Sequence, residues 1–310
     1  MRTYTIFLKL AASLALSFFV LSVAYADSAI KRRLDLGLDI NPAAENTLLL
    51  PSDVAVSNSY IYVVDGGHHR VVVFDQQGNY AFSFGSYGAG KGEFNSPVGI
   101  DVSEGGEVYV ADTANKRIQV FSAAGKFVRL FKVKSGRYII RPIDVLVDEK
   151  AREVYVSGND NHKVMVFSSK GKLKREWGGN GTSEGEFRYP ATLAHLKDGR
   201  VAVVDVLNAR LQIFEKNGDY SIQISGWGVE PGQVFRPKGV AVDKDGDIYI
   251  SDSYLNLVQV FSDVGKLKYI LDTVAPRTLY TPVGMYVDAK NKLYITEMRK
   301  HRISVFSLNP

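Results

Sequence analysis

The chain contains no cysteine, and this absence already narrows its chemistry. Without a thiol it has no disulfide, no cysteine nucleophile and no cysteine for lipid attachment, so its stability must come from packing. Histidine is also scarce, with five residues in 310, and neither sign of charge dominates, with 38 Lys and Arg against 33 Asp and Glu. Such a mild net charge does not indicate a nucleic-acid partner.

The first 26 residues have the features of a secretory signal sequence. Arg2 and Lys9 precede or border an uncharged apolar run at 10–23, and the run is followed by A-Y-A at 24–26, a small-residue cleavage signature. An uncleaved anchor is the alternative, but the run is shorter than the ~20 residues of a membrane-spanning helix. We therefore expect cleavage after Ala26, a periplasmic or secreted mature chain (27–310), and no stable membrane insertion afterwards.

Prolines recur at intervals of 45 to 48 residues, and each begins a unit of short β-branched and aromatic runs separated by Gly-rich or Asp-rich turns. They are Pro51, Pro97, Pro142, Pro190, Pro237 and Pro282. A phenylalanine ends the third expected strand of every unit: Phe74, Phe121, Phe167, Phe214, Phe261 and Phe306. Large side chains that recur once per unit must pack against the neighbouring unit.

Six four-stranded units of this length predict an all-β fold, a six-bladed β-propeller in a single domain. The last unit has only three strands before Pro310, so its fourth must come from elsewhere. Residues 32–40 precede the first proline at the spacing of an outer strand. We expect this N-terminal strand to close the ring beside the strand that ends at Phe306.

The stretch VGIDVSEGGEVYVADTANKRIQVFSAAGKFVRLF, residues 98–131, resembles an NHL repeat, and all six units from about residue 51 to 306 follow its pattern. NHL propellers serve as binding platforms for proteins or RNA, as outer domains of bacterial membrane sensors and, in one branch, as a metal-dependent amidating lyase. The resemblance implies that the lyase would carry histidines directly after the blade-opening prolines. This chain instead has Ser52, Val98, Ile143, Ala191, Lys238 and Val283 there.

We therefore expect no catalytic residues, no metal and no cofactor. The favoured interpretation is an exported, non-enzymatic scaffold or ligand-binding module, monomeric, whose partner is another protein of the cell envelope. A divergent metal-dependent lyase or lactonase of the six-bladed type is the alternative.

Residues 85–94, GSYGAGKGEF, contain the G-x-x-x-x-G-K spacing of a nucleotide-binding loop. Gly92 follows Lys91 where Ser or Thr would hold Mg²⁺, and no helix is expected after it. Equivalent turns carry Glu184 and Pro231 at the lysine position. The stretch is therefore predicted to be a turn between blades.

Acid and arginine recur five residues apart around the turn between strands two and three: Asp65 and Arg70, Asp112 and Arg117, Asp205 and Arg210, Glu297 and Arg302. Each pair is expected to form a turn salt bridge worth under ~1 kcal/mol. One position before the arginine stand His69, His162 and His301, interpreted as solvated turn residues rather than metal ligands. His195 replaces a valine inside the first strand of unit four and is expected to be structural, opposite Ala202.

The loop-rich face that carries the prolines is the expected binding surface. Three of the predicted binding residues stand directly before a blade-opening proline: Arg141, Tyr189 and Arg236. Three follow them closely: Lys238, Asp53 and Asp144. Tyr87 and Trp227 occupy equivalent positions in longer loops above. Arg, Tyr and Trp are enriched in protein interfaces, so this mixture predicts a protein-binding surface. The alternative is that Arg141 and Arg236 pair with Asp53 or Asp144 and only neutralise the channel mouth.

Overall fold

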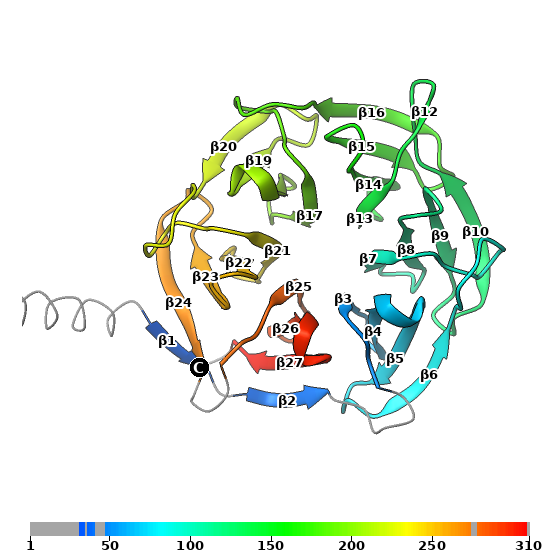
Figure 1. Cartoon of the computed structure of the whole chain (residues 1–310), viewed down its shortest axis with the longest axis horizontal. Helices are drawn as coiled ribbons and strands as arrows, with labels where there is room; N and C mark the ends of the chain where they lie inside the picture. The colour runs from blue at the N-terminus through cyan, green and yellow to red at the C-terminus, as the bar shows by residue number, and fades with distance from the viewer. Residues whose placement is uncertain (1–30, 35, 41–46, 274–277, 309–310) are drawn as a thin grey trace, which may run out of the picture.

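The structure is a computed structural model that describes residues 31–34, 36–40, 47–273 and 278–308. The expected signal sequence, residues 1–26, lies outside the described residues. Six blades surround a central channel, as Figure 1 shows, so the predicted all-β six-bladed propeller is confirmed. No helix in the described part of the chain is long and apolar enough to cross a membrane.

In each blade four strands pair antiparallel, and the innermost strand begins at one of the six prolines. Blade one contains β3 (Pro51–Val56), β4 (Tyr60–Asp65), β5 (Arg70–Asp75) and β6 (Tyr80–Phe84). Blade two contains β7 (Pro97–Val102), β8 (Val108–Asp112), β9 (Arg117–Phe121) and β10 (Phe127–Lys132). Blade three contains β13 (Pro142–Asp148), β14 (Glu153–Gly158), β15 (Lys163–Ser168) and β16 (Leu173–Gly178).

The second half of the ring repeats this plan. Blade four contains β17 (Pro190–His195), β18 (Val201–Asp205), β19 (Arg210–Phe214) and β20 (Tyr220–Ile224). Blade five contains β21 (Pro237–Val242), β22 (Ile248–Asp252), β23 (Leu257–Phe261) and β24 (Leu267–Thr273). Blade six contains β25 (Pro282–Val287), β26 (Lys292–Glu297) and β27 (Arg302–Ser307). A small hairpin, β11 (Lys134–Ser135) and β12 (Tyr138–Ile139), is inserted between blades two and three.

The core lies between neighbouring blades, because each sheet is covered on one face by the preceding blade and on the other face by the following blade. The six phenylalanines that end the third strands are all buried, as expected from their recurrence. Between blades three and four, for example, Tyr155 packs with Phe187 and Phe214 in one cluster. The contacts between blades are therefore made by the residues that repeat once per unit.

The N-terminal segment divides between two blades. β2 (Leu36–Ile40) pairs antiparallel with β27 and supplies the missing fourth strand of blade six, with Ile40 opposite Ile303. β1 (Lys31–Leu34) instead pairs in parallel with β24 of blade five. Residues 32–34 were expected in the closing strand with 36–40, and this part of the prediction is wrong. The outer edge of blade five accepts them, and Arg32 stacks on Tyr269 with its guanidinium carbon 5.2 Å from the ring centre.

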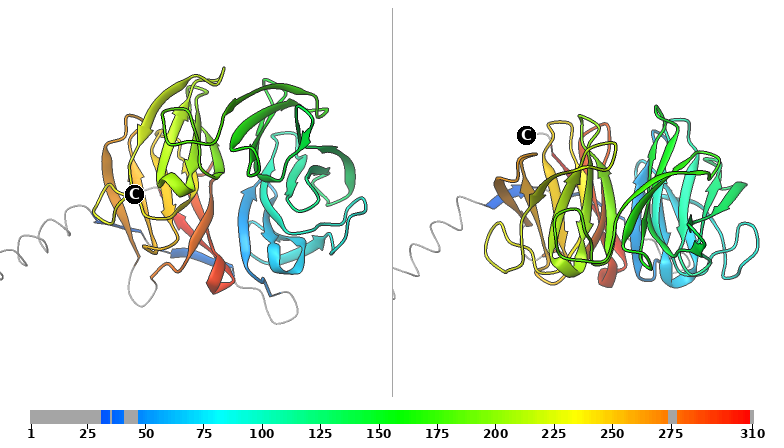
Figure 2. Two further views of the ribbon diagram at one scale, coloured as in Figure 1. Left: turned by 45° about the horizontal axis from the view of Figure 1, so that its top comes forward. Right: turned by 90° about the horizontal axis from the view of Figure 1, so that it is seen from above.

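The ring has two unlike faces, seen edge-on in Figure 2. One face carries the residues before the six prolines and the turns between second and third strands, and we call it the Pro-loop face. It also carries three short 3₁₀ turns, η2 (Gly66–His68), η3 (Val206–Asn208) and η4 (Met298–Lys300), and it faces the viewer in Figure 1. The opposite face, called the far face, carries the hairpin turns that join strands one and two and strands three and four.

Candidate functional site

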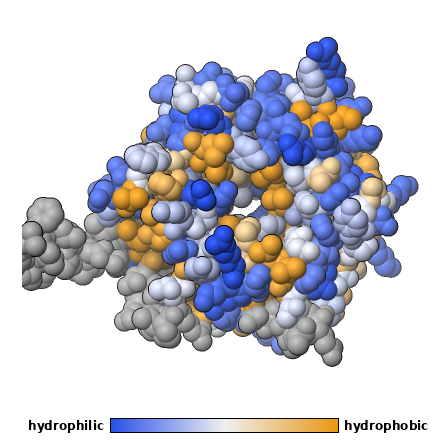
Figure 3. All heavy atoms as spheres, viewed as in Figure 1, coloured by the Kyte–Doolittle hydropathy of each residue, from blue (hydrophilic) through white to orange (hydrophobic). Residues whose placement is uncertain are grey.

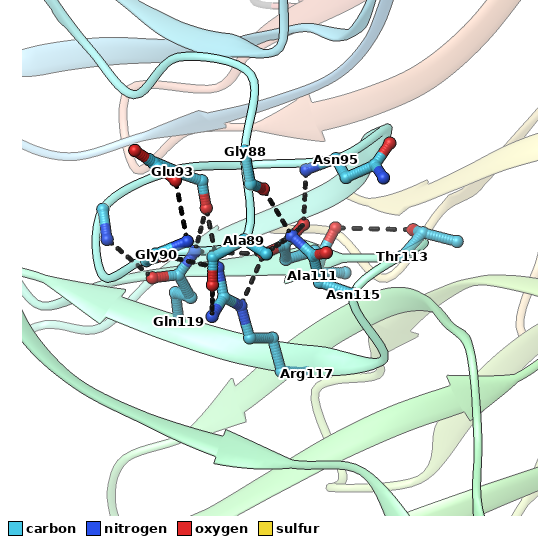
Figure 4. Close-up of polar contacts among 12 residues, drawn as sticks. Gly88, Ala89, Gly90, Glu93, Asn95, Ala111, Thr113, Asn115, Arg117 and Gln119 are labelled. Atoms are coloured by element: carbon cyan, nitrogen blue, oxygen red, sulfur yellow. Dashed lines mark hydrogen bonds and ion pairs between the residues drawn. The ribbon is translucent and has the colours of Figure 1, made fainter.

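The loop that enters blade two is fastened from below by Arg117, as Figure 4 shows. Its Nε donates to Asp112 Oδ2 at 2.6 Å. Its terminal nitrogens donate to three loop carbonyl oxygens at 2.7–2.8 Å, those of Ala89, Gly90 and Glu93. Asp112 is fully buried and balances the guanidinium charge. We call this arrangement the arginine clamp.

The same loop contains the nucleotide-binding spacing, and its backbone excludes that interpretation. A phosphate cradle presents free amides, whereas three amides here already have side-chain acceptors. They are Gly90 N to Glu93 Oε2 (2.7 Å), Gly92 N to Gln119 Oε1 (3.0 Å) and Asn95 N to Asp112 Oδ1 (2.8 Å). The carbonyl oxygens converge on a cation, which is opposite to what an anion site requires. The predicted turn is what the structure has.

The arginine clamp recurs in blade four. Arg210 Nε bonds Asp205 Oδ2 at 2.9 Å, and its Nη2 bonds the carbonyls of Ser183 and Glu186, each at 2.9 Å. All four predicted acid–arginine pairs form, and every one of the four acids is fully buried. The expected contribution of under ~1 kcal/mol is typical of exposed pairs, so it does not carry over to these buried ones. A carboxylate removed from water depends on its partner far more than an exposed one does.

Each of the three histidines of the turn column connects its own blade to the next one. His69, His162 and His301 adopt left-handed backbone conformations, with φ between 53° and 55°. Each Nδ1 accepts the amide of the residue just before the next proline: Ser96 (3.0 Å), Tyr189 (3.2 Å) and Leu50 (3.0 Å). In blade five Asn256 Oδ1 accepts the Thr281 amide in the same way, at 2.7 Å. Because Asn can replace His here, the column is defined by a hydrogen-bond acceptor.

Asp53 and Asp144 do not lie exposed at the channel mouth as expected. The two residues are only 7% and 4% exposed, and their carboxylates bind the inner strands of the next blades. Asp53 Oδ2 accepts the Ile100 amide (3.0 Å) and Asp144 Oδ2 accepts the Leu193 amide (2.8 Å). An innermost strand has an unpaired edge, so its amides need such acceptors. These two aspartates are therefore part of the wall of the channel.

Asp101 completes this set of channel carboxylates by accepting the Val147 amide at 2.7 Å. Burial raises the pKa of Asp101 to about 7 and that of Asp144 to about 7. Burial, and then the nearby Asp144 carboxyl, raise the pKa of Asp53 well above its usual value. Desolvation outweighs the backbone hydrogen bonds that favour the charged form.

Two glycines make room for these aspartates. A Cβ on Gly99 of blade two would collide with Asp144 Oδ1, and a Cβ on Gly284 of blade six would collide with Asp53 Oδ1. Each aspartate thus fits against a glycine of the preceding blade and bonds an amide of the following one. The sequence showed both glycines directly after P-V, but their role depends on contacts between blades.

His195 lies beside the channel, and its predicted cross-strand partner is wrong by one residue. It pairs with Val201, and Ala202 lies opposite Ala194. The imidazole meets the Tyr155 ring edge-on at 5.3 Å, and burial lowers the pKa of His195. Its side chain borders a cavity of about 570 Å³ that opens along the channel toward the far face.

The Pro-loop face exposes most of the large apolar side chains that are exposed among the described residues. Eleven of those fourteen lie there: Leu49, Leu50, Tyr87, Tyr138, Ile139, Tyr189, Leu207, Trp227, Val229, Tyr254 and Tyr280. Figure 3 shows this face, with apolar patches and hydrophilic residues alternating around the central opening. Tyr87 and Trp227 are the most exposed, at 69% and 71%, and they occupy equivalent loop positions as predicted.

The predicted cations of this face have different environments. Arg141 is paired with Asp160, with its Nη2 2.7 Å from Oδ1, and neither Asp53 nor Asp144 is its partner. Arg236 is exposed, and Lys238 beside it is half-buried. Burial, and then the positive charge of Arg236, lower the pKa of Lys238. Across the part of the chain that the structure describes, neither Arg236 nor Lys238 forms an ion pair.

Sequence reasoning missed several residues of this face. The glutamines two positions after each clamp arginine, Gln119 and Gln212, bind the loop from the third strand. Gln259 does the same in blade five, where the arginine is absent. Their recurrence could have been seen as a column. Phe235, which lies between Trp227 and Tyr254, carried no such signal because the equivalent residue of blade two is polar.

The fold and its repeated loop fastenings define a class, the six-bladed β-propellers built from a recurring four-stranded unit. Comparison with protein families matches residues 43–140 to a family described as "6-bladed beta-propeller" and residues 236–261 to the NHL repeat. The chain belongs to the NHL-repeat six-bladed propellers.

Curated relatives match in part only. Protein brain tumor of Drosophila melanogaster is 34% identical over 106 residues, which is 33% of this chain and 10% of that protein. NHL repeat-containing protein 3 of Homo sapiens is 34% identical over 89 residues, 27% of this chain and 25% of that protein. The chain thus spans no more than about a quarter of the length of these two relatives.

Solved structures share the fold over most of the chain. A catalytically inactive virginiamycin B lyase from Staphylococcus aureus, solved with Quinupristin, has a TM-score of 0.63 at 15% identity, covering 88% of this chain and 85% of the lyase. A gluconolactonase from Xanthomonas campestris has a TM-score of 0.67 at 15% identity, covering 89% and 96%. At this identity the likeness concerns the fold alone.

A metal centre like that of a metal-dependent propeller enzyme would need several His, Asp or Glu side chains around one point. The described residues contain no group of three or more such side chains placed to hold an ion. The three turn histidines use Nδ1 for backbone amides in separate blades. Within the ranges that the structure describes, these side chains therefore do not fit a resident metal.

Proposed function

We propose that this protein is an exported binding module that engages another protein of the cell envelope through its Pro-loop face. The observation that carries the proposal is the concentration of exposed large apolar side chains on that face, eleven of the fourteen among the described residues. Exposed apolar groups that gather on one surface mark interaction sites. Tyr, Trp and Arg, which dominate interface hot spots, are all present there.

Site-specific photo-crosslinking tests this function in the native cell. A photoreactive phenylalanine analogue placed at Tyr189, on the Pro-loop face, should yield an adduct of one defined mass whose partner peptides can be assigned. The same analogue at Val264, a more exposed position on the far face (68% against 40% for Tyr189), is the control. Adducts from Val264 and none from Tyr189 would mean that the partner binds the far face, and would refute the proposal for the Pro-loop face.

The export part of the proposal rests on the signal-like segment. Intact-mass measurement of the protein from cells should give a chain that begins at Asp27. Retention of residues 1–26 would refute cleavage. We further propose that the mature chain is a monomer without nucleic-acid ligands, and light scattering of the purified protein checks its mass.

An enzyme is the second candidate, and the solved structures favour it to the extent that a lyase and a lactonase share this fold. Purified protein incubated with gluconolactone, with and without added Ca²⁺ or Mg²⁺, provides the test. Turnover that depends on the added metal would support the enzyme and displace the binding module.

A further inference from the structure

Blade five departs from the loop fastening of blade two at several equivalent positions. In blade two the side chains of Arg117 and Asn115 bind Asp112 and the loop backbone, whereas Asn95 donates only its backbone amide to Asp112. The residues in the same places of blade five are Leu257, Leu255 and Phe235. Both side-chain donors of the clamp are thus replaced by leucine, whereas the acid, Asp252, and its bond from the backbone amide of residue 235 are retained.

Asp252 remains fully buried and is satisfied by backbone alone. Its carboxylate accepts four amides at 2.6–3.0 Å, those of Phe235, Arg236, Tyr254 and Leu255. Among the described residues it has no cationic partner. The loop 226–236 is still held through Gln259, which bonds the Gln233 carbonyl and the Gly232 amide at 2.5 and 2.8 Å. It therefore keeps its shape without the three carbonyl bonds that an arginine clamp would add.

The substitutions build an aromatic strip where blade two has a polar clamp. Trp227 and Phe235 have ring centres 6.1 Å apart, and Phe235 and Tyr254 have ring centres 4.4 Å apart. Trp227 and Tyr254 are 71% and 58% exposed, and Val229 beside them is exposed as well. Large aromatic groups left in water are costly unless a partner covers them.

Two cations follow Phe235 of this strip closely in the chain. Arg236 follows Phe235 directly, and Lys238 is half-buried next to it. Neither belongs to an ion pair within the described chain, whereas the exposed Arg141 of blade three is neutralised by Asp160. Two adjacent unpaired cations, one of them partly desolvated, would gain from a carboxylate brought by a ligand.

We propose that the loop 226–236 of blade five, with Trp227, Tyr254, Arg236 and Lys238, binds an acidic peptide segment that also carries apolar side chains. The proposal rests on the protein-binding function above and names the part of the Pro-loop face and the chemistry of the partner. Apolar side chains of the segment cover the aromatic strip, and its carboxylates meet Arg236 and Lys238.

The geometry favours a peptide over a single-stranded nucleic acid. The rings of the strip are tilted by 43° and 35° to their neighbours, so they do not form a parallel series for stacked bases. Glu230 is exposed in the same loop and would repel a run of phosphates. A peptide can place its carboxylates at the two cations and keep them away from Glu230.

Fluorescence anisotropy of a labelled peptide of alternating glutamate and leucine tests the proposal with the full mature chain. We expect saturable binding that weakens with salt, and no binding of the matching lysine–leucine peptide. Trp227→Ala and Arg236→Glu should each weaken binding roughly tenfold. Tyr87→Ala is the matched control, because Tyr87 has the same loop position and exposure in the clamped loop of blade two. Lys91→Glu is the charge control in that loop.

Each contrary result has a defined meaning. Equal losses from Tyr87→Ala and Trp227→Ala would show that blade five is not special, and binding insensitive to salt and to Arg236→Glu would refute the acidic chemistry. Tighter binding of an oligo(dT) of matching charge, lost in the same variants, would replace the peptide by a nucleic acid. If Tyr189 crosslinks to a partner but the acidic peptide does not bind, this inference fails and the proposed function stands. Crosslinks from Val264 alone would refute the proposed function itself.

Discussion

Replacing Arg117 by leucine, the residue that blade five carries at the same position, removes the arginine clamp of blade two in one step. The Arg117 side chain is only 10% exposed, and that of Asp112 is fully buried. The change removes one charged hydrogen bond to Asp112 and three bonds to loop carbonyls. It leaves a carboxylate without its cation in a site with little water.

The expected cost follows from these contacts. Removing one partner of a buried ion pair typically costs 3–5 kcal/mol, because the other charge stays buried. Asp112 keeps three donors, namely the Asn95 amide, the Asn115 side chain and Gln119, so we take the lower end of this range. Arg117→Leu should therefore lower the free energy of unfolding by about 3 kcal/mol.

Urea denaturation of the mature chain measures this difference. Arg200→Ala is the control, because Arg200 pairs with the half-exposed Asp198 and should cost under ~1 kcal/mol. The reciprocal change, Leu257→Arg, gives Asp252 a cation and should stabilise by about 1 kcal/mol. A loss from Arg117→Leu no larger than that from Arg200→Ala would refute the view that the clamp stabilises the ring.

Three further outcomes follow from the structure. Gly99→Ala drives a methyl group into Asp144 and should cost about 1–3 kcal/mol in urea denaturation, whereas Gly226→Ala, which meets only a side chain 4.0 Å away, should cost much less; equal effects would refute the close fit. Burial raises the pKa of Asp144 to about 7 in the folded state, above its unfolded value, so the folded state keeps a proton that the unfolded state has lost. The stability that this proton contributes is therefore lost as the pH rises from about 4 to about 7. Asp144→Asn should gain stability relative to the native chain across that window, and a difference that stays constant with pH would contradict the raised pKa. Ile40→Ala, in the strand that closes blade six, should cost about 2–4 kcal/mol because Ile40 is buried against Ile303, and a neutral result in thermal denaturation would mean that the closing strand adds little.

Part of the candidate site could be predicted from residues that recur at equivalent positions of the sequence repeat. The acid–arginine pairs, the turn histidines and the equivalence of Tyr87 and Trp227 all repeat at the blade interval, and the structure places them as equivalents. Their surroundings were not readable. The acid–arginine pairs are buried because the loop that enters the same blade folds over them. Asp53 and Asp144 form part of the channel wall because the next blade presents an unpaired amide there.

The number of blades, the residue at which each begins and the side chains of the core follow from the sequence alone, since these depend on a strand pattern of period two and on residues that repeat once per unit. Three features depend instead on how the blades pack in the folded chain: which polar groups lose their water, how residues 31–34 and 36–40 divide between blades five and six, and which loop lacks an arginine clamp. The reason is distance along the chain. Asp53 meets an amide 47 residues away and His301 meets one 251 residues away, and no local pattern encodes contacts of that separation.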